Sequence, residues 1–498
     1  MSPVIHGQRK ALHPWPAALH DVRRTKRVRG ESVAQRSNQW VQRPALPAGG
    51  PPVPSSLYTL PMLTRIAALL LFVATAASAQ TLDQRIEREL PQLVATYKQL
   101  HAAPELSMKE AKTSAFLASQ LRALGYEVTE RVGKYADPAE TAYGVVAIMK
   151  NGAGPTVLFR SDMDALPVTE ATGLPYASTV RTKNATGEEV GVMHACGHDV
   201  HMTTLIGTAK MLASMKERWH GTVMFIGQPA EEIVAGAAAM LRDGLYERFG
   251  KPDYVIALHD SAAVPAGKAA YTPGYTMASS DSVDVTIRGI GGHGAAPQLG
   301  KDPVVIAAEF VLALQTIVSR ERSPLDPVVV TVGSIHGGTK RNIIPDEVKL
   351  YLTIRAYKPE VRDRVIASIE RVARGVALTA GVPEDRMPIV TVHEAERIGA
   401  TFNDPALTER LAAALKQSLG EPQVLRIDPL MVAEDFGRFS LDNKIPAALL
   451  QFGATDPAVL ASNPTPPGLH SSKFAPLPEP ALRTGIKTAT TMLLELLK

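Results

Sequence analysis

Apolar and polar positions along the chain follow two periods, one helical and one strand-like. Apolar residues recur at helical spacing in Arg85–Leu100 and Lys109–Leu124. Short apolar runs, EVTERV, YGVVAIMK, TVLFR, TVMFIG and YVIAL, follow and alternate with helical stretches at about 200–218 and 235–248. Strand-like and helical segments in alternation predict an α/β domain with a mostly parallel central sheet and helices on both faces.

The pattern changes at about residue 280, where SVDVTIRG alternates strictly between apolar and polar residues, as a strand with one buried face does. A helix at about 303–320, the strands VVVTVGSI and EVKLYLTIRAY, a helix at about 360–380 and the strand IVTVHEA follow. The order strand, helix, strand, strand, helix, strand is that of a ferredoxin-like α+β unit. We therefore expect such a unit to be inserted into the α/β domain.

Two segments precede the α/β domain. Residues 62–79, MLTRIAALLLFVATAASA, contain Arg65, a short apolar stretch and Ala-Ser-Ala ahead of Gln80. This pattern is typical of a cleaved secretory signal peptide, and the stretch is too short for a membrane span. Residues 1–61 are rich in Pro and Arg and lack periodicity, so we expect them to be disordered and not part of the real protein, with translation starting at Met62. The alternative is a buried apolar helix behind a disordered basic tail.

The predicted organisation follows from these patterns. It comprises an extension at 1–61, a signal peptide at 62–79, the first part of the α/β domain at 80–279, the inserted unit at 280–395 and the second part of the α/β domain at 396–498. The signal peptide implies export, either into a periplasm or out of the cell, and no stable membrane anchor.

Charge and cysteine content narrow the class of function. The net charge is +4, but residues 1–61 hold nine Lys and Arg against Asp21 and Glu31, so the chain from Gln80 onward is net negative. This distribution argues against nucleic-acid binding. Cys196 is the only cysteine, so no intramolecular disulfide can form. Metal ligation would explain a lone thiol in an exported protein.

Two pairs of side chains in the sequence could hold a metal. Cys196 and His198, in HACGHDVH, lie two residues apart in a Gly-containing turn, and thiolate and imidazole are ligands that zinc and similar divalent ions accept. Glu231 and Glu232, in QPAEE, follow the strand TVMFIG directly. Adjacent carboxylates repel unless a cation separates them, so one could bind metal while the other acts as a general base. The simpler alternatives are a buried thiol beside a surface His and an acidic pair at a helix N-terminus.

Three further positions lie at or near the ends of strand-like runs. Asp162, in RSDMDALP, follows TVLFR and could orient a metal-bound imidazole. His259 ends YVIALH, and His470 lies in LHSSKFAP. Each alone would be read as a turn or surface residue. Together they indicate one site, because open α/β sheets bind ligands at the carboxyl ends of their strands.

Seven motifs now support a resemblance to a known family: DMDALP, CGHDVH, QPAEE, GGHGAAP, VSRE, GGTKRNIIPD and AEDF. From about Gln92 to the C-terminus the chain resembles the zinc-dependent aminoacylase and glutamate-carboxypeptidase family of metallopeptidases. Within it, the chain is similar to the branch of hippurate hydrolases and indole-acetyl-amino-acid amidohydrolases. The resemblance implies a catalytic domain with an inserted dimerisation (lid) domain, a homodimer, and two divalent ions per subunit, zinc or manganese.

The resemblance also implies a role for each candidate residue. The implied metal ligands are Cys196, His198, Glu232, His259 and His470. Glu231 matches the general acid and base, and Asp162 the carboxylate that supports the metal site. His293, in the inserted domain, matches a His that reaches the partner subunit's active site and helps hold the oxyanion. Asn342 and Arg355 match positions that grip the substrate's carboxylate.

The expected function is metal-dependent hydrolysis of the amide bond of small N-acyl amino acids. A dipeptidase or carboxypeptidase with the same metals is the alternative, and Asp260 is a candidate to bind the free α-amine of a dipeptide. A non-catalytic binding protein on this scaffold is disfavoured, because no ligand position is lost. The sequence departs from the usual pattern of that branch at three places, which concern substrate preference. Gln298 stands where a His is usual, Asp260 where an apolar residue is usual, and Met431-Val432 where Met-Gly is usual.

Overall fold

The computed structural model describes residues 80–498 apart from residues 185 and 464. The predicted extension at 1–61 and the predicted signal peptide at 62–79 lie outside the described residues and stay predictions. The described residues contain an eight-stranded sheet, a four-stranded sheet and three two-stranded sheets. The two larger sheets correspond to the α/β domain and the inserted unit expected from the sequence.

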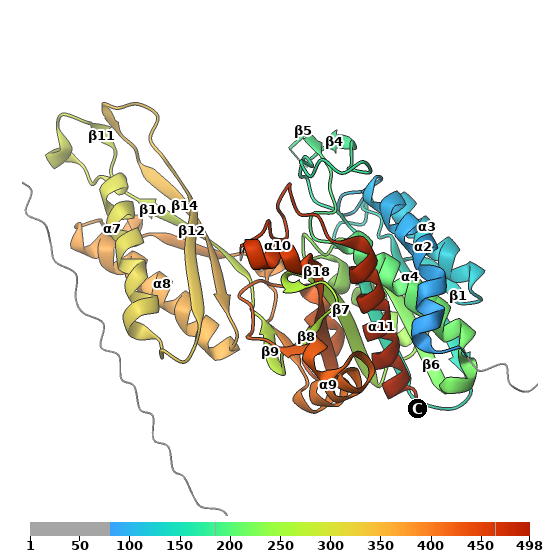
Figure 1. Ribbon diagram of the computed structural model, residues 1–498. Helices are drawn as coiled ribbons and strands as arrows, with labels where there is room; N and C mark the ends of the chain where they lie inside the picture. The colour runs from blue at the N-terminus through green and yellow to red at the C-terminus, as the bar shows by residue number, and fades with distance from the viewer. Residues whose placement is uncertain (1–79, 185, 464) are drawn as a thin grey trace, which may run out of the picture. The chain divides into compact units, whose positions relative to one another are not determined.

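The eight-stranded sheet has the order β1-β2-β6-β3-β7-β18-β8-β17 (Figure 1). In that order, the strands are Glu127–Val132, Gly144–Asn151, Gly221–Gln228, Thr156–Asp162, Tyr254–Pro265, Ala447–Thr455, Ala269–Tyr271 and Val424–Arg426. The pairs β3–β6, β3–β7, β7–β18 and β8–β17 are parallel, and the pairs β1–β2, β2–β6 and β8–β18 are antiparallel. The predicted mostly parallel sheet is therefore confirmed, with antiparallel pairing at β1, β2 and β8.

Helices cover both faces of this sheet. They are α2 Leu82–His101, α3 Ala111–Ala123, α4 His198–Ser214, α5 Gly236–Arg242, α6 Leu245–Phe249, α9 Pro405–Leu419 and α11 Pro478–Leu496. In β3, Val157 and Phe159 pack into a core with α2, α3, α4, α9 and α11, whereas Leu158 packs into a core with α5 and α6. Successive strand residues point to opposite faces, so the continuous apolar run TVLFR serves two cores.

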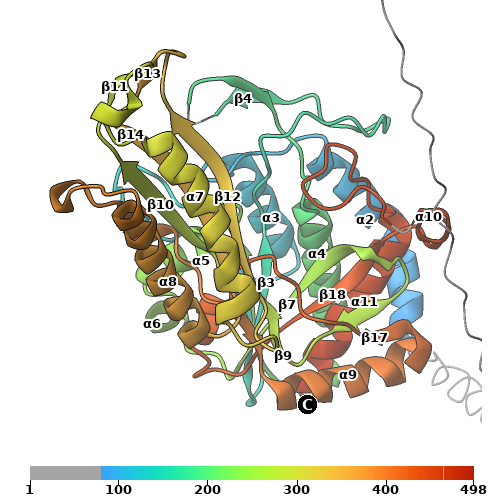
Figure 2. The ribbon, with the colours of Figure 1, turned by 90° about the vertical axis from the view of Figure 1, so that its left-hand side faces the viewer.

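The inserted unit has an antiparallel sheet of order β12-β14-β10-β15, and α7 and α8 pack on one face of it (Figure 2). Its elements are β10 Asp281–Arg288, β11 Gly292–His293, α7 Pro303–Thr316, β12 Val328–Gly337, β13 Ile343–Ile344, β14 Glu347–Ala356, α8 Pro359–Thr379 and β15 Ile389–Val392. Burial alternates along β14, with its inward residues in a core whose buried members all lie within 283–387. The predicted β-α-β-β-α-β order is present, with the small pair β11–β13 added to it.

The remaining elements are short. They are β4 Arg181–Lys183 with β5 Glu189–Gly191, β9 Gly274–Met277 with β16 Thr401–Asn403, α10 Pro457–Ser462, and turns of 3-10 helix at Lys216–Arg218, Pro297–Leu299, Glu384–Arg386, Glu394–Glu396, Glu421–Gln423 and Asp435–Ser440. The helix predicted at 235–248 is two helices, because Gly244 adopts a φ of 77° between α5 and α6. A π-helical turn, Ile317–Glu321, extends α7.

Among the described residues, one helical segment, Pro303–Glu321, has the length and apolar composition of a membrane span. This segment is α7 with its π-helical turn. Its buried residues Ile306, Phe310 and Leu314 pack in the core of the inserted unit, as expected for a helix of a globular domain.

Candidate metal centre

The predicted ligands come from two loops, one strand and the turn that opens one helix; His259, expected at the end of a strand, lies within β7, which continues to Pro265. Glu231 and Glu232 lie in the loop after β6, His259 lies within β7, and His470 lies in the loop after α10. His198 opens α4 directly after Gly197, whose φ of 77° makes the turn that follows Cys196. A Cβ on Gly197 would lie 2.5 Å from the Asp260 carboxylate, so only glycine fits this turn.

The structure brings all the predicted ligands together with Glu231 and Asp162. Three sets of donor atoms each lie within 4.8 Å of one another: Asp162, His198, His201 and His259; Cys196, Glu232 and His470; and His198, Glu231 and Glu232. His198 Nε2 lies 3.8 Å from Glu232 Oε1 and 4.0 Å from Glu231 Oε2. The Cys196 Sγ lies 3.3 Å from His470 Nε2 and 3.8 Å from His259 Nε2.

Two observations indicate that these residues fit a metal. His198 Nε2 and Glu232 Oε1 are buried and have no hydrogen-bond partner among the described residues, although buried polar atoms are normally satisfied. The set of one thiolate, three imidazoles and carboxylates is also typical of zinc and similar divalent ions. Apart from the exposed His470, the donors are buried or half-buried, and together they form a site suited to divalent cations.

Main-chain carbonyls fix the orientation of two imidazoles. His198 Nδ1 lies 2.7 Å from the carbonyl oxygen of Asp164, and His259 Nδ1 lies 2.7 Å from that of Asp260. A carbonyl can only accept, so each Nδ1 carries the proton and donates it. Each Nε2 is then directed at the donor cluster, which is how metal-binding imidazoles are held.

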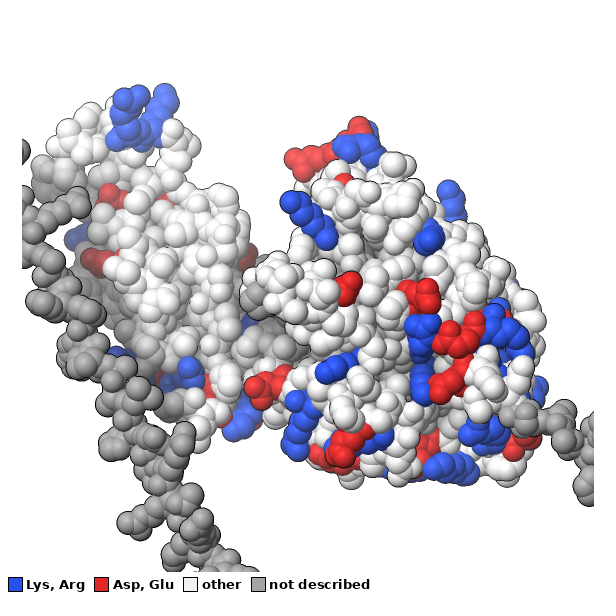
Figure 3. Space-filling view, viewed as in Figure 1, with Lys and Arg blue, Asp and Glu red and all other residues white. Residues whose placement is uncertain are grey.

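The site contains an excess of buried carboxylates. Seven are buried: Glu110, Asp162, Asp164, Glu231, Asp260, Glu434 and Asp435. Among the described residues, Arg160 is the only buried Lys or Arg, and it donates hydrogen bonds to Asp162 at 2.6 Å and to Glu434 at 2.8 Å. Acidic and basic side chains are interspersed on the face in Figure 3, whereas the seven carboxylates of the site are buried.

The carboxylate excess raises several pKa values. Burial, with the nearby Glu434 carboxylate, raises the pKa of Glu231 well above its usual range. Burial raises the pKa of Glu232 to about 7, and burial with Glu434 raises that of Asp435 to about 7. Burial is the largest cause of each shift, and the negative charge of neighbouring carboxylates adds to it. Bound divalent cations would supply the missing positive charge.

The structure adds residues that the sequence did not assign to the site. Asp164 accepts hydrogen bonds from the main-chain N–H of Glu231 at 3.1 Å and of Glu232 at 3.0 Å. His201 Nδ1 lies 2.6 Å from Asp162, and the N–H of Asp260 donates to His201 Nε2 at 2.8 Å. Both ring nitrogens of His201 are thus engaged by protein groups, so His201 supports the site without a free ligand atom.

Arg160, Glu434 and Asp435 are the other additions. Three of the added residues belong to motifs named in the sequence analysis: Asp164 to DMDALP, His201 to CGHDVH and Glu434 to AEDF. Membership of these motifs was the one signal in the sequence that could have assigned them to the site. Arg160 lies two residues before Asp162, but only the fold places it against Glu434 and Asp435.

Asp260 does not lie where a substrate amine could reach it. Its carboxylate is buried beneath Gly197, with one oxygen 3.1 Å from His201 Nε2. Burial alone would raise the pKa of Asp260, but the neighbouring His201 and His259 imidazoles lower it. Asp260 therefore supports two imidazoles of the site instead of offering a free carboxylate.

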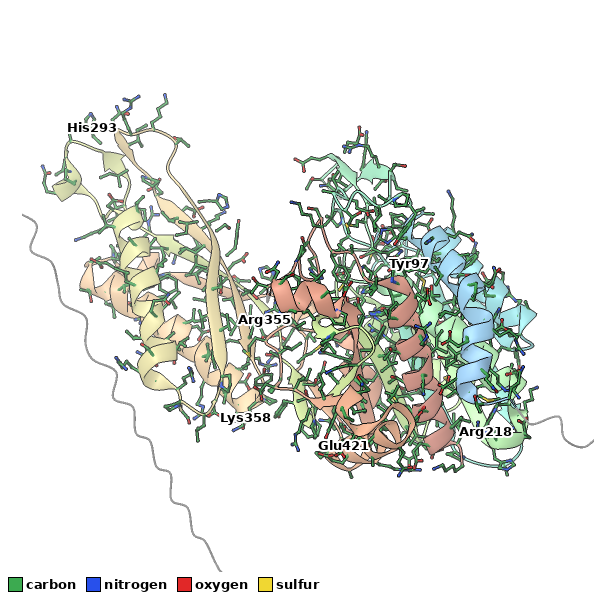
Figure 4. All side chains as sticks on the ribbon, in the orientation of Figure 1. Tyr97, Arg218, His293, Arg355, Lys358 and Glu421 are labelled. Carbon is green, nitrogen blue, oxygen red and sulfur yellow. The ribbon has the colours of Figure 1, made fainter. Side chains whose placement is uncertain are left out.

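The structure places the three candidates of the inserted unit at two locations. His293, in β11, is exposed at one end of the unit (Figure 4). Asn342 lies beside it, because the N–H of Gly294 donates to the Asn342 carbonyl at 2.9 Å. Arg355 lies near the other end of β14, where it is half-buried. Burial lowers the pKa of Arg355, although the Asp281 carboxylate opposes the shift. Among the described residues, none of the three belongs to the donor cluster.

A buried cluster of this kind, at the edge of a mixed α/β sheet, defines a metal-dependent hydrolase. The model of the peptidase family M20/M25/M40 matches residues 158–495. Hippurate hydrolase from Campylobacter jejuni is 36% identical over 355 residues, which cover 71% of this chain and 86% of that protein. Thermostable carboxypeptidase 2 from Saccharolobus solfataricus is 35% identical over 396 residues, which cover 78% of this chain and 91% of that protein.

A solved structure agrees with these matches. The YXEP protein of Bacillus subtilis, described as a dinuclear metal binding peptidase from the M20 family, superposes with a TM-score of 0.64 at 27% identity, covering 82% of this chain and 99% of that one. The chain belongs to the M20/M25/M40 peptidase family and is a metallohydrolase that acts on amide or peptide bonds.

Proposed function

We propose that this enzyme hydrolyses the amide bond of N-acyl amino acids, with hippurate-like compounds as the substrate class. The observation that carries the proposal is the position of Glu231, whose carboxylate borders the donor cluster 4.0 Å from His198 Nε2. No described protein group donates a hydrogen bond to that carboxylate. Glu231 is thus free to exchange a proton with water and substrate.

The proposed metal ligands are Cys196, His198, Glu232, His259 and His470, and they would hold two divalent ions, zinc or manganese. Bound ions of this kind supply Lewis acidity, which lowers the pKa of water and polarises a carbonyl. Burial and several carboxylates, Glu232 first among them, raise the pKa of the Cys196 thiol well above its usual range. Cys196 would therefore ionise to a thiolate only when cations are bound, so the proposed role of this residue is to retain the metal ions.

Glu231 would act twice in the reaction. It takes a proton from the attacking water as the water adds to the amide carbonyl, and it then delivers that proton to the nitrogen of the leaving amine. Asp164 holds the main chain on both sides of this carboxylate, and Asp162 holds His201 and Arg160. These contacts orient the base.

The position of Asp260 favours an acyl group over an aminoacyl group. A dipeptidase needs an acceptor for the free α-amine of its substrate, and the one acid that the sequence offered is enclosed beneath Gly197. A carboxypeptidase acting on blocked peptides stays the alternative, and the carboxypeptidase among the relatives supports that reading.

The test is a turnover assay on N-acyl amino acids and dipeptides, run on the metal-loaded enzyme and after chelation. We expect amine release from N-acyl amino acids that is lost on chelation and restored by zinc or manganese. A clear preference for unblocked dipeptides would contradict the proposal and return Asp260 to the substrate site.

We further propose a homodimer formed through the inserted unit. Among the described strands, the ten-residue β12 pairs only with β14 and so has one open edge. The adjacent α7 exposes Val305 and Leu312. An open edge beside an apolar helix favours pairing with a second copy across a twofold axis. In such a dimer His293 and Asn342, together at one end of the unit, would complete the partner subunit's active site.

The final proposal is export through the predicted signal peptide at 62–79, into a periplasm or the medium. Its support is the order of Arg65, an apolar stretch and Ala-Ser-Ala ahead of Gln80. The intact mass of the exported protein tests it: a mature chain beginning at Gln80 is expected, and one that retains Trp15 or Trp40 would contradict it.

A further inference from the structure

His470 is the most exposed of the proposed metal ligands. Its side chain is 57% exposed, whereas the side chains of the other four are largely buried. It lies in the segment between α10 and α11, in which none of the described residues belongs to a helix or strand. Its φ of 66° is also strained for a residue other than glycine. Contacts with other segments must therefore hold this ligand in position.

Two main-chain hydrogen bonds hold the segment that carries His470. The N–H of His470 itself donates to the carbonyl of Ala195 at 2.7 Å, in the turn before α4. Two residues further along, the carbonyl of Ser472 accepts from the N–H of Ala171 at 2.8 Å. Ala171 belongs to the β3–β4 loop, residues 163–180, which connects those two strands. The position of His470 therefore depends on how firmly the β3–β4 loop is held.

Glu170, the residue before Ala171, anchors the β3–β4 loop from the inside. Its side chain is fully buried. One oxygen accepts a hydrogen bond from the hydroxyl of Thr172 and lies 3.1 Å from His101 Nε2, and the other accepts from the N–H of Ser178 at 2.6 Å. Two of these three partners belong to the loop, so the loop is folded around the carboxylate. Hydrogen bonds to a buried charge are strong and are costly to lose.

His101, the last residue of α2, joins this carboxylate to α4. Its Nε2 lies 3.1 Å from Glu170, and its Nδ1 lies 2.7 Å from Asp199 in the first turn of α4. Tyr97, labelled in Figure 4, and Tyr176 of the β3–β4 loop pack against the imidazole, with ring centroids 5.6 Å and 5.4 Å from it. Glu170 is thus fixed to the helix that begins at the metal centre, and not only to its own loop.

We propose that Glu170 is a positioning residue for the metal ligand His470 and that it sets the affinity of one of the two ions. It acts through the hydrogen bond between Ala171 and Ser472. An imidazole nitrogen binds a single ion, so a displaced His470 should weaken the binding of one ion and leave the other bound. This inference rests on the proposed function, in which His470 is a ligand, and adds the residue that holds this ligand in place.

The test dialyses the full-length, zinc-loaded enzyme against a series of zinc buffers and measures the zinc bound per subunit. In Glu170→Gln one oxygen becomes an amide nitrogen, so at least one of the three donors loses its acceptor. We expect one ion to bind as tightly as in the wild type and the other about tenfold more weakly. Thr172→Val removes one donor only and should give a smaller shift in the same direction, which also serves if Glu170→Gln does not fold. The matched control Glu189→Gln changes an exposed glutamate in β5 and should leave both affinities unchanged.

His470→Ala is the reference for the ligand itself and should weaken the binding of one ion more than Glu170→Gln does. If His470→Ala weakens one ion while Glu170→Gln and Thr172→Val weaken neither, the ligand assignment stands and the inference is overturned. Equal loss of both ions from Glu170→Gln, together with a lower melting temperature, would also overturn it, because general destabilisation does not select one ion. Normal affinity for both ions in His470→Ala would instead contradict the ligand assignment on which the inference rests.

Discussion

The carboxylate of Asp164 accepts a hydrogen bond from the main-chain N–H of Glu231 at 3.1 Å, and its other oxygen accepts one from the neighbouring Glu232 at 3.0 Å. One buried side chain thus fixes both the proposed base and a proposed ligand. The chain needs this support, because Ala230 and Val234 on either side of the pair have φ values of 49° and 55°. Such backbone is strained for residues other than glycine and persists only where its surroundings hold it.

Replacing Asp164 by Asn should therefore impair the centre without unfolding the protein. The amide has only one acceptor atom, so one of the two N–H groups loses its partner. We expect kcat/KM to fall by about 10- to 100-fold, with weaker metal retention. Steady-state kinetics and metal analysis measure both effects. Ser107→Ala removes only the 2.6 Å hydrogen bond that Ser107 donates to Asp164 and serves as the milder control. Wild-type kinetics in Asp164→Asn would remove this residue from its positioning role.

Glu231→Gln and Cys196→Ser should separate proton transfer from metal binding. The amide of Gln keeps the size of Glu231 but cannot take a proton, so turnover should fall by about 100-fold or more while bound metal stays near its normal level. Cys196→Ser removes a thiolate from the donor set, so metal content itself should fall. Turnover and metal content of each purified variant are measured together. Full metal occupancy in Cys196→Ser would contradict the ligand assignment.

The sequence predicted those features that repeat locally. Runs such as TVLFR and SVDVTIRG have the length and period of strands, and both are strands, β3 and β10. Strands of three or four residues, such as β8 and β17, were missed because they are too short to display a period.

The ligand residues were predictable from short segments such as CGHDVH and QPAEE, although His259 lies within β7 and not at the end of a strand. The ion network of Arg160 could not be predicted from the sequence. It joins β3 to Glu434 and Asp435 across more than half of the described chain, and no local pattern indicates which distant carboxylates a buried Arg will meet.

The buried His101 and its two acidic partners should make stability depend on pH. His101 lies between Asp199, at 2.7 Å, and Glu170, at 3.1 Å. Burial opposes its charge, but the hydrogen bond and charge of Asp199, with those of Glu170, raise its pKa to about 9. Because this folded-state pKa exceeds the unfolded value, the stabilisation is complete below about pH 6.5 and is lost as the pH rises through about 9.

The size of this effect is up to about 3 kcal/mol, from the difference between the two pKa values. Urea unfolding midpoints of the chelated protein should fall with rising pH, most steeply between about pH 6.5 and 9, and level off above about pH 9. His101→Gln cannot titrate and leaves Asp199 and Glu170 facing each other, so it should be less stable at pH 7 and show a flatter pH profile. An unchanged slope in this variant would show that another group causes the pH dependence.

The proposed role of His293 in the partner subunit's active site leads to a complementation test. If the role is correct, His293→Ala and Glu231→Gln each inactivate their own homodimer but leave different sites damaged. In a mixed dimer, the subunit with intact Glu231 receives the intact His293 of the other subunit. One of the two active sites of the mixed dimer is therefore complete. Random mixing makes about half of the dimers mixed, so about one quarter of the wild-type activity should return.

Coexpression of the two variants, with purification through different tags, gives the mixed dimer directly. Its activity should then approach half that of the wild type, whereas tagged homodimers of each variant stay inactive. If His293 instead acts within its own chain, no site in the mixed dimer holds both groups and no activity returns.

The Leu312→Glu variant provides an independent check, because a charge on the exposed apolar face of α7 should shift the protein toward monomers in sedimentation experiments and lower its activity in parallel. An active Leu312→Glu monomer would contradict both the interface and the role of His293 across it.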